Sequence, residues 1–185
     1  MENKQQLDKI AWINAGFRAL CERGPAGLKA EPLARELGVS KGSFYWHFAN
    51  LAAFREAMIE HWVALATQGI IEVVEAHSQD PAERLRHLVH MATEPPPAAV
   101  GGQGAEGAIR CWGRADIAVG ERLNAVDTAR IDYCEKLFLQ LGVKPRDAQI
   151  RGRLLYAALI GLEALNQAGL VEMREDLQAF LDTLL

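Results

Sequence analysis

The stretch VSKGSFYWHF, residues 39–48, gathers several hydrogen-bond donors into one short segment. Because successive helical residues point about 100° apart, the run from Tyr45 to His47 cannot serve a single buried face. Ammonium, hydroxyl and imidazole groups of the kind carried by Lys41, Ser43, Tyr45 and His47 donate to phosphate oxygens. The stretch therefore indicates an exposed surface that contacts a polyanion.

The charge of the chain is distributed to match such a surface. Over all 185 residues the net charge is −4, yet residues 1–55 hold eight basic and five acidic side chains. The remainder holds twelve basic and nineteen acidic side chains. A basic N-terminal part on an acidic body predicts a polyanion partner for that part alone.

The cysteines and the apolar runs indicate in which cellular compartment the protein is expected. Cys21, Cys111 and Cys134 are far apart in the sequence, which argues against a disulfide framework or a zinc site and favours a reducing cytoplasm. Cys111 and Cys134 are redox-sensing thiols or buried small hydrophobes, and we favour the second interpretation. The polar start carries no secretory signal, and no apolar run approaches the roughly 20 residues of a membrane span. We expect a cytoplasmic protein without membrane contact.

Apolar residues at helical spacing predict an all-α chain of about nine helices. The first helix ends at Gly24-Pro25, and two short helices and a long one follow. The stretch TEPPPAAVGGQG, residues 93–104, predicts an irregular segment. We expect one domain over residues 1–50, which carries the polyanion-binding surface, and a second domain over residues 51–185. The helices after the first are expected at about 31–37, 40–47, 50–76, 81–92, 106–114, 119–140, 146–168 and 172–184.

The two short helices joined by LGVS predict a helix-turn-helix. Ala34 is small enough for close crossing, and Gly38 can take the positive φ of the turn. Ser40 is a good N-cap for the second short helix. Phe44 and Phe48, four residues apart, are expected to anchor that helix inward. The small core between the two helices would consist of Leu33, Leu37, Val39 and Phe44.

The segments LARELGVSKGSFYWHF and the preceding helix that ends in ERG resemble the signature of the tetracycline-repressor (TetR) family of bacterial transcription regulators. The resemblance covers about residues 7–60. It implies an all-helical homodimer whose N-terminal three-helix domain binds a palindromic DNA operator. It also implies a larger C-terminal domain that binds a small molecule and dimerises.

The resemblance places Lys41, Gly42, Ser43, Tyr45 and His47 on the DNA-contacting helix. Tyr45 and His47 would hold phosphates, whereas Ser43 and Trp46 would touch bases or the sugar edge. Trp46 could equally pack against the first or fourth helix.

Two positions depart from the family pattern. Lys29 stands where the family often has Thr, so a helix cap is lost and a phosphate contact could replace it. Leu51 stands where the family usually has Lys, so one phosphate contact is missing and the operator could be bound more weakly.

Candidates for the effector site are large side chains of the C-terminal part. Arg110, Arg114 and Asp116 could supply polar groups beside Trp112, or form an ion-pair network instead. His87 and His90 have a spacing that could hold a metal, although solvated or hydrogen-bonded histidines explain them better, so we expect no metal and no cofactor. The predicted effector-binding residues are Trp62, Met91, Arg110, Trp112, Tyr133 and Tyr156, of which the apolar members could also be ordinary core.

The resemblance puts the dimer interface on the last two helices, and RGRLLYAALIGLEALNQAGL supports this through apolar residues on two sides of one helix. In a twofold dimer the last two helices would form a four-helix bundle with their copies. The predicted interface residues are Leu154, Ala158, Gly161, Leu165, Phe180 and Leu184.

These observations predict a ligand-responsive DNA-binding transcriptional regulator, a repressor released from its operator by a small-molecule effector. The alternatives within this class are an activator and a redox- or metal-responsive regulator. A helical enzyme is the alternative from another class. The sequence shows no metal cage, phosphate loop or nucleophile elbow, so we expect no enzyme and no catalytic residue.

Overall fold

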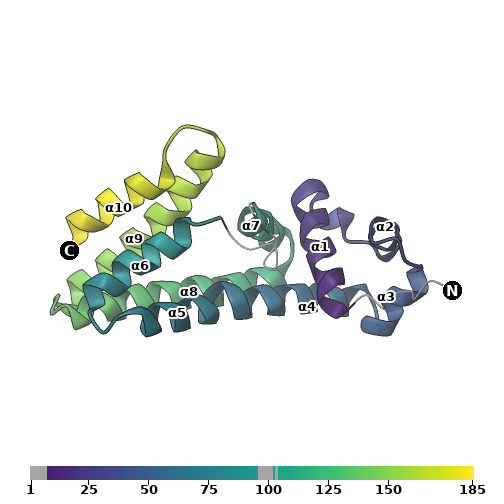
Figure 1. Cartoon of the computed structure of the whole chain (residues 1–185), viewed down its shortest axis with the longest axis horizontal. Coiled ribbons are helices and arrows are strands. Elements are labelled where there is room, and N and C mark those ends of the chain that lie inside the picture. Colours follow the sequence, from purple (N-terminus) through teal and green to yellow (C-terminus); the bar gives the residue numbers. More distant parts are fainter. Residues whose placement is uncertain (1–7, 96–101, 103) are drawn as a thin grey trace. The chain divides into compact units, whose positions relative to one another are not determined.

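The computed structural model describes residues 8–95, 102 and 104–185, and in this part of the chain helices are joined by turns without any strand (Figure 1). The prediction of an all-α chain is confirmed. Most of the irregular segment expected at 93–104 lies outside the described residues. No helix among the described residues combines the length and the apolar character that a membrane span needs.

Contacts group the chain into two compact units. Unit 1 comprises Met1–Val63 and Pro95–Leu123, and unit 2 comprises Ala64–Glu94 and Asn124–Leu185. The sequence predicts a boundary after residue 50, whereas this grouping keeps the fourth helix, and a helix from the second half of the chain, with the N-terminal helices.

Unit 1 is built around its first helix, α1 (Lys9–Arg23), which contacts α2, α4 and α7. Asp8 begins α1 by accepting from the Ala11 N–H at 2.7 Å, and Asn50 begins α4 by accepting from the Ala53 N–H at 2.9 Å. A 3₁₀ turn (Pro25–Gly27) follows α1. The other helices of this unit are α2 (Ala30–Glu36), α3 (Lys41–His47), α4 (Leu51–Val63) and α7 (Ala105–Ala115).

An aromatic cluster forms the centre of unit 1. The centroid of the Phe44 ring on α3 lies 5.3 Å from that of Trp12 on α1 and 5.3 Å from that of Phe54 on α4, and both pairs pack edge to face. Phe48 lies 4.9 Å from Phe54 between ring centroids. Such pairs contribute about 0.5–1.5 kcal/mol each beyond area burial. Phe44 and Phe48 thus fix α3 against two other helices, as the sequence predicts.

Unit 2 begins with a π turn (Ala64–Gly69), which is followed by α5 (Ile70–His77). The single long helix expected over 50–76 is therefore α4, one widened turn and α5. The other helices of unit 2 are α6 (Pro81–Thr93), the larger part of α8 (Ile117–Gln140), α9 (Pro145–Gln167) and α10 (Met173–Leu184).

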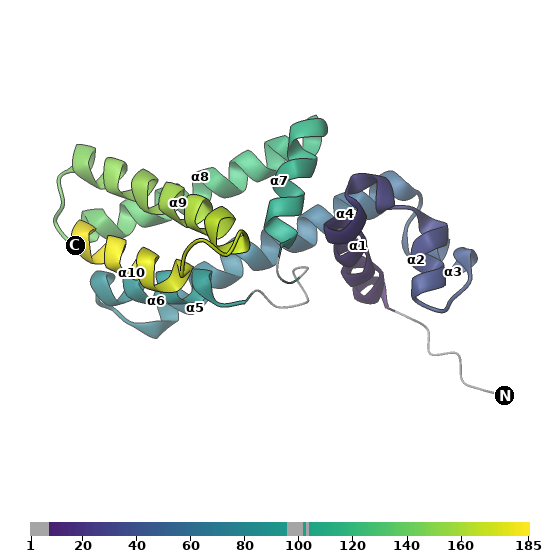
Figure 2. The ribbon, with the colours of Figure 1, turned by 90° about the horizontal axis from the view of Figure 1, so that it is seen from above.

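The core of unit 2 draws on all five of its helices, and Figure 2 shows α10 running alongside α9 and α6, both of which it contacts. Gly152 of α9 lies so close to α8 that an added Cβ would sit 2.9 Å from the Glu135 backbone nitrogen. Arg84 of α6 is buried and donates to the carbonyls of Ser78 and Glu75 at the end of α5, at 2.6 and 3.3 Å. The fully buried core residues include Val74, Leu85, Leu137, Phe138, Ala148 and Leu181.

Candidate nucleic-acid interface

The α2–α3 turn has the backbone of a helix-turn-helix. Gly38 adopts φ +68°, where a side chain would be strained, and the Val39 N–H donates to the Ala34 carbonyl at 2.9 Å. Leu33 and Ala34 are buried beneath the turn, whereas Leu37 and Val39 are only half-buried. Ser40 occupies the N-cap of α3, although its side chain accepts no capping hydrogen bond.

Helix α3 separates buried from exposed side chains cleanly. Phe44 is buried, while Tyr45 is 53% exposed and Trp46 is 83% exposed. Lys41 and Gly42 are also exposed, and Ser43 is half-buried. The high exposure of Trp46 rules out the alternative in which its ring packs inside unit 1.

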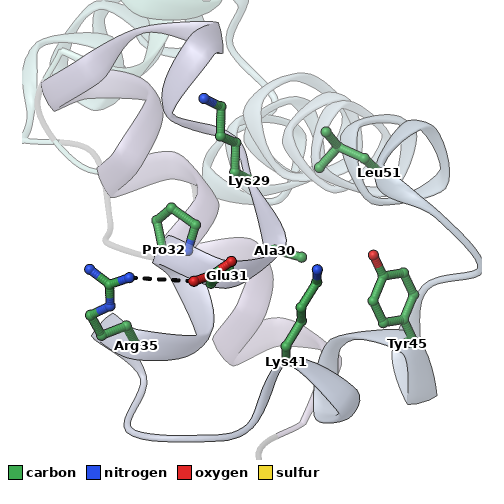
Figure 3. A pocket seen from close by; sticks show the side chains of 8 residues that line it. All are labelled: Lys29, Ala30, Glu31, Pro32, Arg35, Lys41, Tyr45 and Leu51. Carbon is green, nitrogen blue, oxygen red and sulfur yellow. Dashed lines mark ion pairs between the residues drawn. The ribbon is translucent and has the colours of Figure 1, made fainter.

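An open hollow lies beside this helix, between α2, α3 and the start of α4. Figure 3 shows Lys41 and Tyr45 extending from α3 with their polar ends toward the same side, while Lys29 stands before α2 and Leu51 begins α4. We call this feature the α2–α3 hollow. Its lining consists of Lys29, Ala30, Glu31, Pro32, Arg35, Lys41, Tyr45 and Leu51.

The charges around the α2–α3 hollow are unevenly paired. Glu31 lies 3.6 Å from Arg35, and Glu36 is engaged by Arg18 at 3.0 Å, so the carboxylates of α2 have cations of their own. Within the described part of the chain, no carboxylate forms an ion pair with Lys29 or Lys41. Two ammonium groups and the Tyr45 hydroxyl thus remain available to an anion beside α3.

Both departures from the family pattern fall on this hollow. Lys29 occupies the N-cap of α2, and its side chain makes no capping hydrogen bond there. Leu51 is half-buried and adds an apolar wall where a cation would complete the ring of donors.

His47 is placed differently from Tyr45. The His47 ring is half-buried beside Phe48, and its Nε2 atom is buried without a hydrogen-bond partner. A phosphate contact by His47 would therefore have to use Nδ1.

The predicted effector-binding residues are divided between the two units. Trp62, Arg110 and Trp112 belong to unit 1, whereas Met91, Tyr133 and Tyr156 belong to unit 2. The tryptophans and tyrosines are buried, and burial raises the pKa of the Tyr133 hydroxyl to about 12. Arg110 donates to Glu106 at 2.8 Å, and Met91 is half-buried.

Two polar partners of Tyr156 were missed by sequence reasoning. The Tyr156 hydroxyl donates to Asp127 Oδ1 at 2.6 Å and accepts from Arg130 at 3.2 Å, which joins α8 to α9 inside unit 2. Asp127 and Arg130 are 29 and 26 residues away from Tyr156, so no local pattern links them.

Of the predicted dimer residues, Leu154, Gly161 and Leu165 are exposed. Ala158, Phe180 and Leu184 are half-buried and pack on the core of their own unit. Ala157 is the exposed small residue at that level of α9.

The cysteines differ from one another in burial. Burial raises the pKa of Cys134 to about 12, so this thiol acts as a small hydrophobe. Cys111 is exposed, which corrects the expectation that it is buried. Among the described residues no group of three or more His, Cys, Asp and Glu side chains is arranged to hold a metal ion.

Residues 13–58 match the family described as bacterial regulatory proteins, tetR family. The transcriptional regulator AcuR of Cereibacter sphaeroides is 33% identical over 82 residues, which are 44% of this chain and 37% of AcuR. The match thus spans little more than a third of that relative's length.

Solved structures extend the likeness along the chain. A TetR transcriptional regulator from Legionella pneumophila has a TM-score of 0.77 at 11% identity, covering 99% of this chain and 97% of that one. The reduced form of E. coli NemR has a TM-score of 0.77 at 16% identity, covering 96% and 98%. These likenesses show that the chain has the fold of TetR-family regulators, and its N-terminal segment, residues 13–58, is a tetR-family domain.

Proposed function

We propose that this protein binds a palindromic DNA operator as a homodimer and represses transcription until a small-molecule effector releases it. The observation that carries the proposal is the α2–α3 hollow, where Lys29, Lys41 and the Tyr45 hydroxyl surround a surface, and among the described residues no carboxylate is paired with either lysine. This is a binding function, and it requires no catalytic residue and no cofactor.

The recognition helix supplies two kinds of contact in this proposal. Lys41 and Tyr45 bind backbone phosphates, which positions α3 but carries no sequence information. Ser43 and Trp46 face the base edges of the major groove, where an exposed indole can contact the methyl group of thymine. The aromatic cluster beneath Phe44 holds the helix rigidly while it does so.

A stripe on α9 supports the homodimer. Exposed apolar or small residues recur along one face at alternating spacings of four and three, the period of paired helices. Ile150 is 44% exposed and Leu154 is 48% exposed, so a substantial apolar surface is left uncovered in one chain. We call this set, together with the adjacent Leu165, the α9 seam, and it consists of Ile150, Leu154, Ala157, Gly161, Ala164, Leu165 and the C-cap residue Ala168.

The dimer explains how an effector could act at a distance. A twofold dimer binds well only if its two recognition helices are about one DNA turn apart, roughly 34–36 Å. An effector that binds better to a state with another separation shifts the population toward that state and weakens operator binding. In unit 2 the Tyr156, Asp127 and Arg130 network offers hydrogen-bonding groups between two helices that such a molecule could use.

A promoter fusion tests the proposal. The gene's own upstream region would drive a reporter in cells with and without the protein, with Lys41→Ala/Tyr45→Ala as a DNA-binding variant and Lys144→Ala as the matched exposed control. Repression predicts low reporter output with the wild type and the control, and high output with the double variant. Lower output in the absence of the protein would instead identify an activator. A thermal-shift screen of metabolites would then find the effector as a compound that raises Tm and restores output.

A further inference from the structure

The hairpin of α5 and α6 in unit 2 carries three histidines that the DNA-binding function does not use. His77 is the last residue of α5, and His87 and His90 lie on α6. The rings of His77 and His87 are stacked with centroids 3.8 Å apart and planes within 8° of parallel. His90 continues the group at 6.2 Å from His87.

The stacked geometry favours neutral rings. Two imidazoles in face-to-face contact pack as aromatic groups, but two imidazolium ions at this distance repel each other. With the dielectric constant of water, the Coulomb repulsion between two charges 3.8 Å apart lowers the population of the doubly charged pair about sixfold relative to the same pair without repulsion. Partial burial increases this penalty. Ring faces in contact also point their nitrogens sideways, which is unsuited to a shared metal ion.

The two rings differ in their surroundings. His77 is exposed at the C-terminus of α5. His87 is half-buried, and burial, together with the neighbouring rings of His77 and His90, lowers its pKa from the ordinary value. The doubly charged stack therefore forms only at a pH below the ordinary pKa of histidine.

The surrounding charges do not neutralise the pair. On α5, Glu75 is held by Arg84 and by Lys136 of α8, both at 3.0 Å. On α6, Arg86 lies 2.9 Å from Glu83 and 4.0 Å from Asp182 of α10. Glu94, at the end of α6, is shared by His90 at 3.5 Å and Arg174 of α10 at 2.5 Å. These carboxylates are already engaged by other cations, so they offer His77 and His87 little compensation.

We propose that the His77–His87 stack is a proton-sensitive contact, which holds α5 to α6 when a ring is neutral and loosens the hairpin when both rings are charged. A group whose pKa is lower in the folded state gives stability that is present above its unfolded pKa, about 6.5 for histidine. That stability is lost as the pH falls through the folded pKa. The loosening is therefore expected below about pH 6.5 and does not depend on the proposed DNA function.

Hydrogen exchange and NMR on the full chain test this inference, with EDTA present throughout to exclude metal binding. Backbone amides of α5 and α6, corrected for intrinsic exchange, should lose about sixfold or more protection between pH 7.5 and pH 5.5, while amides of α1 should not. The His87 ring should titrate below pH 6.5 in the wild type and closer to 6.5 in His77→Gln. In that variant the acid loss of protection in α5 and α6 should largely disappear.

His90→Gln is the matched control, because it removes a histidine of the same helix but keeps the stack. It should retain most of the wild-type pH dependence. The inference is overturned if α5 and α6 keep their protection at pH 5.5, if His77→Gln loses protection as steeply as the wild type, or if His87 titrates at its ordinary pKa in the wild type.

Discussion

At the scale of single residues, neighbouring side chains of α3 differ in burial. Phe44 is buried against the rings of Trp12, Phe48 and Phe54, while the next two residues, Tyr45 and Trp46, are exposed. Three successive residues of α3 thus comprise one side chain that packs in the core and two that are exposed to a binding partner. Substitutions of Tyr45 and Trp46 should change DNA binding and leave folding almost intact.

Tyr45 and Trp46 should affect DNA binding in different ways. Tyr45→Phe removes one hydroxyl donor, so affinity should fall several-fold for operator and for random DNA alike, because phosphates are the same in both. Trp46→Ala should lower the ratio of specific to random binding, by up to about tenfold, since it removes a contact to bases. Fluorescence anisotropy with both DNAs measures this. Equal losses for the two variants on both DNAs would refute the division of roles.

Leu51 offers a gain-of-function test of the α2–α3 hollow. Leu51→Lys should add a cation beside Lys29, Lys41 and Tyr45, and so raise DNA affinity. The slope of log affinity against log salt should steepen by about 0.9 for each added phosphate contact. Leu51→Gln is the matched control, because it removes the apolar side chain without adding charge. An unchanged salt slope in Leu51→Lys would show that phosphate does not enter this hollow.

At the scale of helices, glycine sets how closely α9 approaches α8. The Cβ of Gly152→Ala would sit 2.9 Å from the Glu135 nitrogen and 3.2 Å from the Ile131 carbonyl, and both belong to backbone that cannot move aside cheaply. We expect a loss of about 1–3 kcal/mol in the free energy of unfolding. Denaturant unfolding measures it. Gly42→Ala is the control, since its Cβ would meet only Ser40 Oγ at 3.7 Å, and equal stability of the two variants would contradict the packing described.

Sequence reasoning predicted elements whose determinants lie close together in the chain. Gly38 in the turn, Asn50 at the start of α4, and Phe44 with Phe48 on one side of α3 all follow from spacings of a few residues. Residues 93–104 were also expected to break the helical pattern, although most of them lie outside the described part.

The sequence was less informative where distant segments determine the environment. Tyr156 finds Asp127 and Arg130 only because α9 packs on α8, and His77 reaches His87 only because α5 and α6 fold together. On α9, Ala157 and Ala158 point about 100° apart. Which of the two is exposed is determined by the helices that α9 packs against.

At the scale of the whole molecule, the proposed function requires two copies of the chain. Leu154→Glu/Leu165→Glu places two carboxylates on the α9 seam and should give monomers, because burying them without partners is costly. The monomers should also bind operator at least tenfold more weakly, since one chain covers only one half-site.

Light scattering measures the oligomeric state, and Gln79→Glu/Gln140→Glu is the control that adds the same charge at exposed positions away from the seam. A monomeric wild type, or a double seam variant that remains dimeric, would contradict the dimer proposed here.

Selection of bound fragments from a genomic DNA pool tests the central claim most directly. The wild-type protein should enrich fragments that share an inverted repeat, with half-site centres about one DNA turn, 34–36 Å, apart. Lys41→Ala/Tyr45→Ala should enrich nothing, because both substituted side chains are exposed donors beside α3 while the buried rings remain in place. The account is contradicted if the wild type enriches no common sequence, or if the double variant binds the same fragments as well as the wild type does.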